Sequence, residues 1–274
     1  MQCSRIIIPL LGDSRHMLLL RTAIPKCPVT TVLFDFDGTI STLRHGWEQV
    51  MEPLMIELLG EGSADMVRAY IDESTGVQTI HQMKWLAGQV RQRKGAAADP
   101  WEYKAEYNRR LMLTVSRRRE ALLDGTVKRE DYIIAGAEAL LKALCGRGVQ
   151  LYVASGTDDP DVKAEAEALG MSAYFAKIAG APIGAENCSK EAVIRELLSS
   201  GVPGGRLAVV GDGKVEIMTG REHGARTLGV ASDEGALSGI DELKRERLIK
   251  AGADAITGDF LDLPELIKFF MGES

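Results

Sequence analysis

The stretch Val32-Leu33-Phe34-Asp35-Phe36-Asp37-Gly38-Thr39 decides how the rest of the chain is interpreted. It continues a β-branched and apolar run that begins at Thr30, and such a run predicts a buried strand. Asp35 and Asp37 follow at the end of that strand. Two carboxylates this close repel each other, so a positive charge must compensate them, and Mg2+ fits because it prefers hard oxygen ligands. The ordinary alternative is a turn and helix N-cap, where Asp, Gly and Thr are common.

Strands and helices alternate in the second half of the chain, from about residue 133. Apolar strands that alternate with helices indicate a parallel sheet covered on both faces, so we predict an α/β fold with a Rossmann-like core. The ligand site of such a sheet lies at the carboxyl ends of its strands, near the point where the strand order reverses. The expected strands are 150–154, 207–210, 227–230 and 255–257, and the expected helices are 138–145, 160–169, 190–199, 214–223, 240–250 and 264–270.

Residues 44 to about 130 follow a different pattern. Apolar residues recur at helical spacing, as at Val50, Leu54 and Leu58, and glycines and Pro100 separate four or so helices. We therefore predict an all-helical cap domain over 44–130. An insertion directly after the first core strand lies over the predicted site, where a lid belongs.

The predicted core consists of residues 29–43 and 131–274. Residues 1–28 are expected to be an N-terminal extension, in which apolar runs at 5–11 and 17–24 predict a hairpin or extra edge strands.

A second pair of acidic residues follows another apolar strand. Asp212 comes directly after Gly211 at the end of the strand 207–210, and Glu216 follows four residues later. These acids would complete an oxygen site with the first pair. The alternative is a strand-to-helix turn, in which acidic residues favour the helix N-terminus.

Two further segments carry groups that suit a phosphate. Ser155-Gly156-Thr157 follows the strand 150–154, where a hydroxyl and backbone N–H groups can hold phosphate oxygens, although the same tripeptide is common in loops. Lys190 begins a helix, where its charge opposes the helix dipole. Such local conflicts tend to occur at functional sites, whereas a solvated lysine is the usual alternative.

Together, these segments resemble the haloacid dehalogenase superfamily. That family's motifs are an apolar strand ending in D-x-D-G-T, a strand ending in Ser or Thr, a Lys, and G-D-x-x-x-D. They correspond here to Asp35–Thr39, Ser155, Lys190 and Gly211-Asp212, with Glu216 in the last acidic position. Glu216 in place of the family's Asp keeps the negative charge but has a longer side chain. The match covers roughly 30–36 and 133–270, and the helical segment resembles the family's cap domain.

The resemblance implies hydrolysis of a phosphate ester through an aspartyl phosphate. It makes Asp35 the nucleophile and Asp37 the general acid that later activates water. Asp35, the backbone carbonyl of Asp37, and Asp212 would hold Mg2+, with Glu216 close by. Members that cleave carbon–halogen or carbon–phosphorus bonds do not use a second Asp at this position, so Asp37 favours phosphate esters.

The resemblance also implies the groups that bind the substrate. Lys190 and Ser155, with N–H groups near Gly38 and Gly156, would stabilise the transferring oxygens. Thr39 and Thr157 complete the predicted phosphate-binding set.

The mouth of the pocket is expected close to the first motif. Arg44 and His45 follow it and would lie there, where Arg44 could meet a substrate carboxylate or second phosphate, unless it belongs to a surface hinge. Residues 76–79 lie between two predicted cap helices and are expected to project into the site.

Several other functions remain open at this point. A phosphomutase uses the same aspartyl phosphate and needs a closed cap that excludes water. A phosphonate- or halide-cleaving member and a non-catalytic binding protein are the remaining alternatives, because a fold does not fix a function.

The composition limits the partners of the chain. Its 274 residues carry a net charge of −6, which argues against broad nucleic-acid binding. No apolar run approaches the roughly 18 residues of a membrane span, so no membrane partner is expected. The four cysteines form no C-x-x-C pair, which predicts reduced thiols and a cytoplasmic protein. We expect a small phosphorylated metabolite as substrate, and the oligomeric state stays open.

Overall fold

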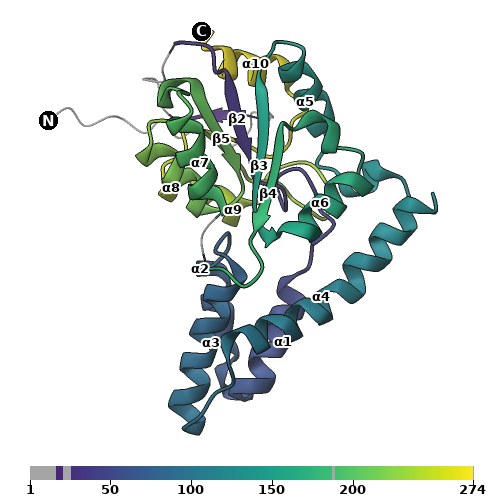
Figure 1. Cartoon of the computed structure of the whole chain (residues 1–274), viewed down its shortest axis with the longest axis vertical. Coiled ribbons are helices and arrows are strands. Elements are labelled where there is room, and N and C mark those ends of the chain that lie inside the picture. Colours follow the sequence, from purple (N-terminus) through teal and green to yellow (C-terminus); the bar gives the residue numbers. More distant parts are fainter. Residues whose placement is uncertain (1–16, 21–25, 187–188, 274) are drawn as a thin grey trace, which may run out of the picture.

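The computed structural model describes residues 17–20, 26–186 and 189–273. These residues form a seven-stranded sheet in the order β1-β7-β6-β5-β2-β3-β4, with helices on both faces (Figure 1). All neighbouring strands are parallel except β1, which runs antiparallel to β7. The predicted α/β class with a Rossmann-like core is therefore confirmed. The strands are β1 (Met17–Leu19), β2 (Thr31–Phe34), β3 (Gln150–Asp158), β4 (Lys177–Ala181), β5 (Leu207–Gly211), β6 (Arg226–Val230) and β7 (Ala255–Thr257).

Alternating side chains of the strands supply the two faces of the core, because successive residues of a strand point to opposite sides. In β2, Val32 and Phe34 pack with one set of helices, whereas Leu33 packs with the other. The first set is α5 (Ala137–Cys145), α6 (Asp159–Ala168) and α10 (Leu263–Met271), and the second is α7 (Ser189–Ser199), α8 (Lys214–Glu222) and α9 (Glu242–Ala251).

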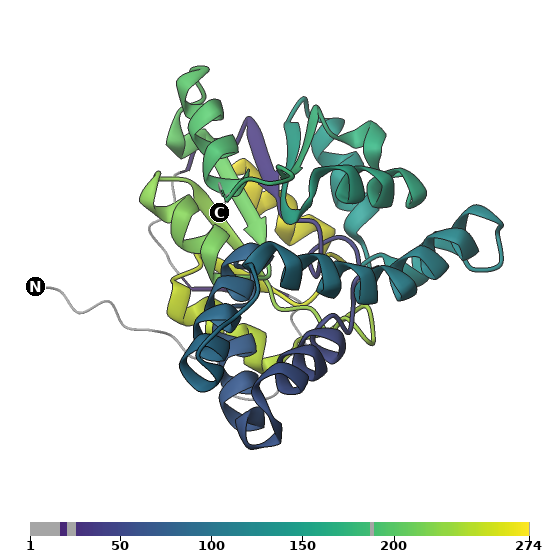
Figure 2. The same cartoon turned by 60° about the horizontal axis from the view of Figure 1, so that its bottom comes forward.

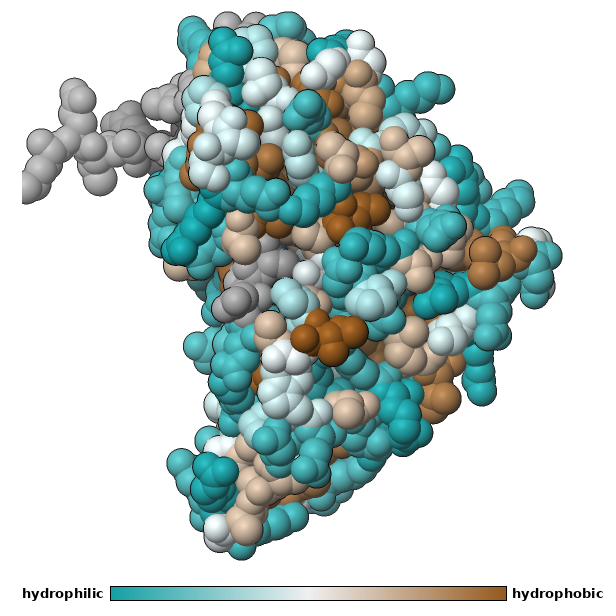
Figure 3. All heavy atoms as spheres, viewed as in Figure 1, coloured by the Kyte–Doolittle hydropathy of each residue, from teal (hydrophilic) through white to brown (hydrophobic). Residues whose placement is uncertain are grey.

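The helical block, which we define as Glu48–Leu123, lies in the chain between β2 and β3 and next to the carboxyl ends of the strands (Figures 1 and 2). Its helices are α1 (Glu48–Leu59), α2 (Ala64–Glu73), α3 (Thr79–Lys94) and α4 (Pro100–Leu123). They pack around an apolar core of their own, to which each helix contributes buried side chains such as Met55, Val67, Met83 and Leu111. The side of the block that is seen in Figure 3 is mostly hydrophilic.

The structure differs from the sequence-based prediction in two strands. Lys177–Ala181 forms the edge strand β4, which the sequence analysis did not predict. Strand β3 also continues to Asp158, so Ser155-Gly156-Thr157 belongs to the strand and not to a loop after it. Both differences have one cause: residues 152–154 and 158 of β3 pair with β4, and the ladder extends a segment that looked like loop material. Polar residues in a strand are tolerated where the side chains face a site.

The N-terminal extension is described only in part. Met17–Leu19 pairs with β7, as the edge-strand alternative expects. The predicted partner run at residues 5–11 lies outside the described residues, as do Cys3 and Cys188. Cys27 and Cys145 carry free thiols. In the part of the chain that the structure describes, every helix is too short or too polar to cross a membrane.

Candidate active site

The candidate site lies where the strand order reverses, between β2 and its neighbours β3 and β5. Asp35 directly follows β2, and its backbone N–H donates to the Val210 carbonyl of β5 at 2.8 Å. Its Oδ2 accepts from Lys190 Nζ at 2.9 Å, and Lys190 also donates to Glu216 Oε2 at 3.0 Å. Sequence segments separated by 155 positions thus meet at one point, as a parallel sheet predicts.

Burial shapes the charges of this group, since Asp35, Lys190 and Glu216 are at most 7% exposed. Burial raises the pKa of the Asp35 carboxyl well above its usual range, and the Lys190 ammonium opposes that rise. Burial alone would lower the pKa of Lys190, but the Asp35 and Glu216 carboxylates raise it. Lys190 is therefore a fixed positive charge. The prediction of a functional lysine at this helix start fits its position better than a solvated side chain does.

Three carboxylates form a group with the geometry of a metal site. Asp35, Asp212 and Glu216 each offer an oxygen, and these oxygens lie within 4.8 Å of one another. Glu216 Oε1 also accepts from the Gly213 N–H at 2.7 Å, which fixes its side chain at the start of α8. Carboxylate oxygens in this number suit a hard divalent cation. The set of residues present therefore fits a metal ion.

A second lysine, Lys244, compensates negative charge beside the three carboxylates. Lys244 Nζ on α9 lies 3.1 Å from Asp212 Oδ2 and 2.6 Å from Glu234 Oε1. Burial raises the pKa of Asp212, and Lys244 opposes that rise. Lys244 and Glu234 are not among the site residues predicted from the sequence. Glu234 follows the predicted strand 227–230, so searching every strand end for acidic residues would have found it, whereas no local signal marks Lys244.

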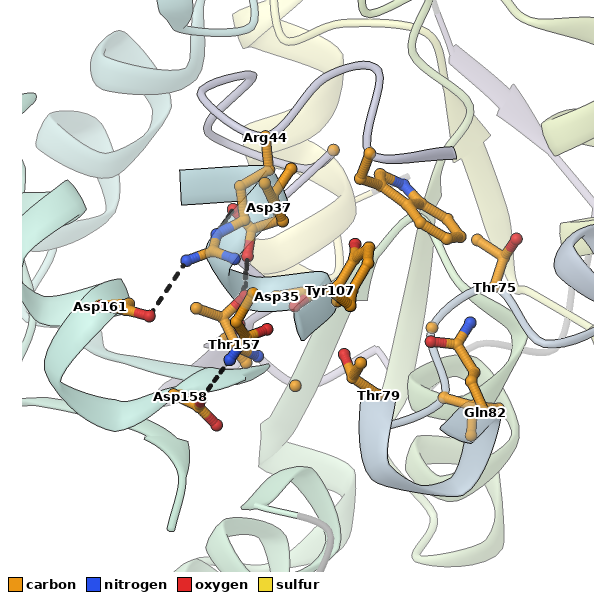
Figure 4. Close-up of a pocket in the computed structure, with 18 of the residues that line it drawn as sticks. Asp35, Asp37, Arg44, Thr75, Thr79, Gln82, Tyr107, Thr157, Asp158 and Asp161 are labelled. Atoms are coloured by element: carbon orange, nitrogen blue, oxygen red, sulfur yellow. Dashed lines mark hydrogen bonds and ion pairs between the residues drawn. The ribbon is translucent and has the colours of Figure 1, made fainter. Parts of the chain in front are cut away.

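The carboxylate of Asp37 turns away from the three acids. Its Oδ2 accepts from Thr157 Oγ1 at 2.9 Å and from Ser155 Oγ at 3.3 Å, and Oδ1 lies 4.0 Å from Arg44 Nε (Figure 4). Burial raises the pKa of Asp37, against the effects of Arg44, Thr157 and Ser155. A carboxyl whose pKa is raised holds a proton more readily, as a general acid must. Because its side chain is held by Thr157 and Ser155, Asp37 could contribute to the predicted metal site only through its backbone carbonyl.

Gly38 has a role that differs from the expected one. Its N–H donates to the Ser41 carbonyl at 2.8 Å, so this N–H does not point to a phosphate. Its φ of +73° suits glycine, and a Cβ here would lie 2.3 Å from Asp212 Oδ2. Gly38 therefore makes room for the Asp212 carboxylate beside Asp35.

Arg44 lines the pocket, but other groups already hold its guanidinium. Nε and Nη2 donate to Glu165 at 3.1 and 2.7 Å, and Asp161 lies 3.6 Å away. Burial raises the pKa of Glu165 to about 7, and Arg44 opposes that rise. This arrangement favours a role in orienting Asp37 over the predicted contact with a substrate carboxylate or second phosphate.

The pocket above Asp35 has walls from both parts of the chain. The core contributes residues such as Ser155, Gly156 and Thr157, and the helical block contributes an opposite wall. Figure 4 shows Thr75, Thr79 and Gln82 on that wall, across from Asp37 and Arg44. The residues of the helical block that line the pocket are Thr75, Gly76, Val77, Thr79, Gln82, Lys104, Tyr107, Asn108 and Leu111, with Trp47 just before it.

The loop before α3 closes the pocket from the helical block. Gly76, Val77 and Thr79 line the pocket, as predicted for residues 76–79. At Gly76, a Cβ would lie 3.2 Å from Gly213 Cα and 3.5 Å from Glu216 Oε2. The backbone of the helical block at Gly76 therefore contacts the backbone of the loop at Gly213, which leads to Glu216.

Three predicted site residues lie outside the pocket lining, namely Thr39, His45 and Glu216, of which Glu216 still belongs to the group of three carboxylates. Thr39 is completely buried behind the wall, and its Oγ1 has no hydrogen-bond partner among the described residues. His45 is about half exposed, with Nδ1 3.5 Å from Glu234 Oε2. Thr39 therefore does not reach the pocket, and His45 is linked to the site through Glu234.

Lys104 and Asn108 of α4 are pocket residues that the sequence analysis missed. Lys104 Nζ donates to both oxygens of Asp158 at 2.6 Å, and Asn108 Nδ2 donates to Asp158 Oδ2 at 2.9 Å. These contacts join the helical block to the end of β3. No local pattern marks them, because helical spacing in α4 is equally consistent with a solvated face.

Comparisons with known proteins agree with this geometry. A family model for haloacid dehalogenase-like hydrolases matches residues 29–224. A 5'-nucleotidase of Pseudomonas aeruginosa is 26% identical over 214 residues, which cover 78% of this chain and 86% of that protein. A phosphoglycolate phosphatase of Rhodospirillum rubrum is 28% identical over 138 residues, covering 50% of this chain and 54% of that protein.

Solved structures share the fold at low sequence identity. A β-phosphoglucomutase from Clostridium difficile has a TM-score of 0.63 at 14% identity, covering 88% of this chain and 97% of that one. A predicted phosphoglycolate phosphatase from Haemophilus somnus has a TM-score of 0.60 at 15% identity, covering 87% and 97%. The family match spans every strand from β2 to β5 and the helical block between them, so the chain belongs to the haloacid dehalogenase-like hydrolases.

Proposed function

We propose that this hydrolase is a Mg2+-dependent phosphomonoesterase that acts on a small phosphorylated metabolite through an aspartyl phosphate. One observation carries the proposal: Asp35 lies in the pocket against Lys190, with Asp212 and Glu216 on one side and the hydrogen-bonded Asp37 on the other. The names of the two curated relatives support a phosphate monoester as substrate.

The nucleophile in this proposal is a carboxylate oxygen of Asp35. It attacks phosphorus, the bond to the leaving oxygen breaks, and the phosphoryl group stays on Asp35. Lys190 favours the ionised form of the attacking carboxylate and orients it, because its ammonium donates directly to Oδ2 and opposes the rise in the pKa of Asp35 that burial causes.

Asp37 moves the proton in both halves of the reaction. Its carboxyl protonates the leaving oxygen and then takes a proton from the water that attacks the aspartyl phosphate. Thr157 and Ser155 hold Oδ2, and Arg44 lies on the side of Oδ1, so the side chain has a fixed direction.

The proposed cation would be held by the carboxylates of Asp35, Asp212 and Glu216 and by the backbone carbonyl of Asp37. Mg2+ there would offset the repulsion between the Asp35 carboxylate and the phosphoryl oxygens. Lys244 already lies beside Asp212 and Glu234, and it compensates the charge that the cation does not.

We also propose that residues 44–130 act as a cap domain over the core, 29–43 and 131–274. The pocket walls from the helical block and the contact between Gly76 and Gly213 support this division. A covered pocket favours a small metabolite over a macromolecular substrate. Free thiols at Cys27 and Cys145 favour a reducing compartment such as the cytoplasm.

The test is phosphate release from an aryl phosphate and from a panel of phosphorylated metabolites, with and without Mg2+. We expect release by the wild type only with Mg2+, and a loss of about a thousand-fold or more in Asp35→Asn. Asp65→Asn is the matched control, because Asp65 is fully exposed on α2.

Each contrary result has a distinct meaning. Release by Asp35→Asn at the wild-type rate would contradict the assignment of the nucleophile. A product that keeps its phosphate in a new position would replace the phosphatase with a phosphomutase, which uses the same Asp35 chemistry.

A further inference from the structure

More carboxylates than cations line the pocket, and each cation is already paired with a carboxylate. Among the described residues, the lining carries six carboxylates and three cations, namely Asp35, Asp37, Asp158, Asp161, Asp212 and Glu234 against Arg44, Lys104 and Lys190. Each of the three cations is bound to a carboxylate at 2.6 to 2.9 Å, if the shortest contact of each is taken. The phosphoryl group has Lys190 and the proposed Mg2+ as partners.

Among the residues that the structure describes, the part of the pocket that faces the helical block offers no unpaired cation to a second anion. Arg44 is held by Glu165, and Lys104 is held by both oxygens of Asp158. A carboxylate or second phosphate on the leaving group would have to displace Asp158 or Glu165 and would then lie beside the carboxylate that it displaced. Like charges in such proximity strongly disfavour binding.

The groups that remain available there are uncharged. The hydroxyls of Tyr107 and Thr79 have no hydrogen-bond partner among the described residues, and Tyr107 is only 4% exposed. Gln82 uses its Nε2 on Ser74 at 3.0 Å, which leaves its carbonyl oxygen to the pocket. Figure 4 shows the Tyr107 ring between Asp37 and the wall formed by Thr79 and Gln82. These three groups belong to the pocket lining, so a ligand in the pocket can supply the hydrogen bonds that they lack within the protein.

We propose that the substrate is the phosphate monoester of an uncharged alcohol that carries further hydroxyl groups, such as a sugar or nucleoside. The aromatic faces of Trp47 and Tyr107 pack against its carbon frame, and Tyr107, Thr79 and Gln82 bind its hydroxyls. Phosphate esters that carry a carboxylate or a second phosphate are disfavoured. This inference rests on the proposed phosphatase function and adds the class of the leaving group.

The test compares two matched pairs of substrates with the wild-type enzyme and Mg2+. The first pair is glycerol 1-phosphate and 3-phosphoglycerate, and the second is phenyl phosphate and 4-carboxyphenyl phosphate. In each pair, we expect the uncharged member to have a kcat/KM about tenfold or more above that of the carboxylate. Equal or reversed values in both pairs, with phosphate released, would overturn this inference and leave the phosphatase proposal standing. No release from any of the four would overturn both.

Variants of two tyrosines on α4 distinguish an effect on substrate recognition from an effect on folding. In Tyr107→Phe, we expect kcat/KM to fall about tenfold for glycerol 1-phosphate and to change little for phenyl phosphate, which has no hydroxyl to bind. Tyr103→Phe is the matched control, because its hydroxyl accepts from the Ala98 N–H at 3.1 Å and lies outside the pocket lining. An equal fall for both substrates in Tyr107→Phe would contradict a role in binding substrate hydroxyls.

Asp158→Asn tests the charge argument itself. It frees Lys104 from its carboxylate, so the preference for glycerol 1-phosphate over 3-phosphoglycerate should shrink about tenfold. Asp72→Asn is the control, because it removes another ion pair between the helical block and the core, Arg247 to Asp72 at 3.3 Å, without touching this pocket. An unchanged preference in a folded Asp158→Asn variant would show that the pairing of Lys104 does not select the substrate.

Discussion

At the scale of single residues, the main feature of the site is its buried negative charge. Asp35, Asp212 and Glu216 bring three negative charges within 4.8 Å in a buried place, and Lys190 and Lys244 supply two positive charges beside them. Glu234 shares Lys244 with Asp212 and adds a fourth negative charge, so two negative charges are left uncompensated, which one divalent cation would offset. The proposed reaction therefore depends on the protonation state of each carboxyl group. The proton that Asp37 would donate to the leaving oxygen is the easiest of these to test.

Replacing Asp37 with Asn should harm poor leaving groups most. Without a general acid, the leaving oxygen departs unprotonated, and general acid catalysis typically contributes about 10² to 10⁴ in rate. We expect a loss of this size for glycerol 1-phosphate in the phosphorylation step and a much smaller loss for 4-nitrophenyl phosphate, whose leaving group is a stable anion. Rapid-quench kinetics of a single turnover measure that step. Equal losses for both substrates would show that Asp37 does not donate a proton to the leaving group.

Residue types and their strand-end positions were enough to predict much of this site. Asp35, Ser155, Lys190 and Asp212 meet around one pocket because the carboxyl ends of parallel strands share an edge of the sheet. The paired state of Arg44 could not be predicted, since Glu165 is 121 positions away on α6. Long-range partners such as these leave no periodic pattern in the sequence.

At the scale of elements, the contact between the helical block and the core depends on a glycine. Gly76 has a φ of +81° and lies against Gly213, in the loop that leads to Glu216. The fold prediction also depended on elements. The strands β2, β5 and β6, which are rich in β-branched and large apolar residues, were predicted, whereas β4 (Lys177–Ala181) has one such residue, Ile178, and resembles a loop.

Gly76→Ala should weaken closure of the helical block. The new Cβ must push against the backbone of Gly213, and a side chain at this φ costs about 1 to 2 kcal/mol. We expect kcat/KM to fall about tenfold, as steady-state kinetics would show. Gly95→Ala is the matched control, because Gly95 has a φ of +79° but nothing within 4 Å of its Cβ position. If both variants lose activity equally, backbone strain and not the contact with Gly213 is responsible.

At the scale of the whole molecule, two apolar cores meet at one polar pocket. The core cluster of the helical block is separate from the clusters of the sheet, and the described links between the two parts include Lys104 to Asp158, Arg247 to Asp72 and Lys84 to Glu186. The change of periodicity near residues 44 and 130 is the basis in the sequence for the proposed cap domain. It could not predict the links, because each pairs charges that look like ordinary solvated side chains.

Mg2+ should stabilise the whole fold if it binds the three carboxylates. A ligand that binds only the folded state raises stability by about 2.7 kcal/mol at a hundred times its Kd. We expect Tm of the wild type to rise with MgCl2 and not with KCl of equal ionic strength. In Asp212→Asn, which removes one of the three ligands, the rise should largely disappear. An undiminished rise in that variant would place the cation elsewhere.

The most direct test of the central claim is to trap the phosphorylated enzyme. The wild type is mixed with an aryl phosphate and Mg2+, quenched in acid within one turnover, digested and analysed by mass spectrometry. We predict phosphate on the peptide that contains Asp35, removable with hydroxylamine as expected for an acyl phosphate, and none in Asp35→Asn. Phosphate on another residue, or full turnover without any covalent phosphate on Asp35, would contradict the aspartyl-phosphate mechanism.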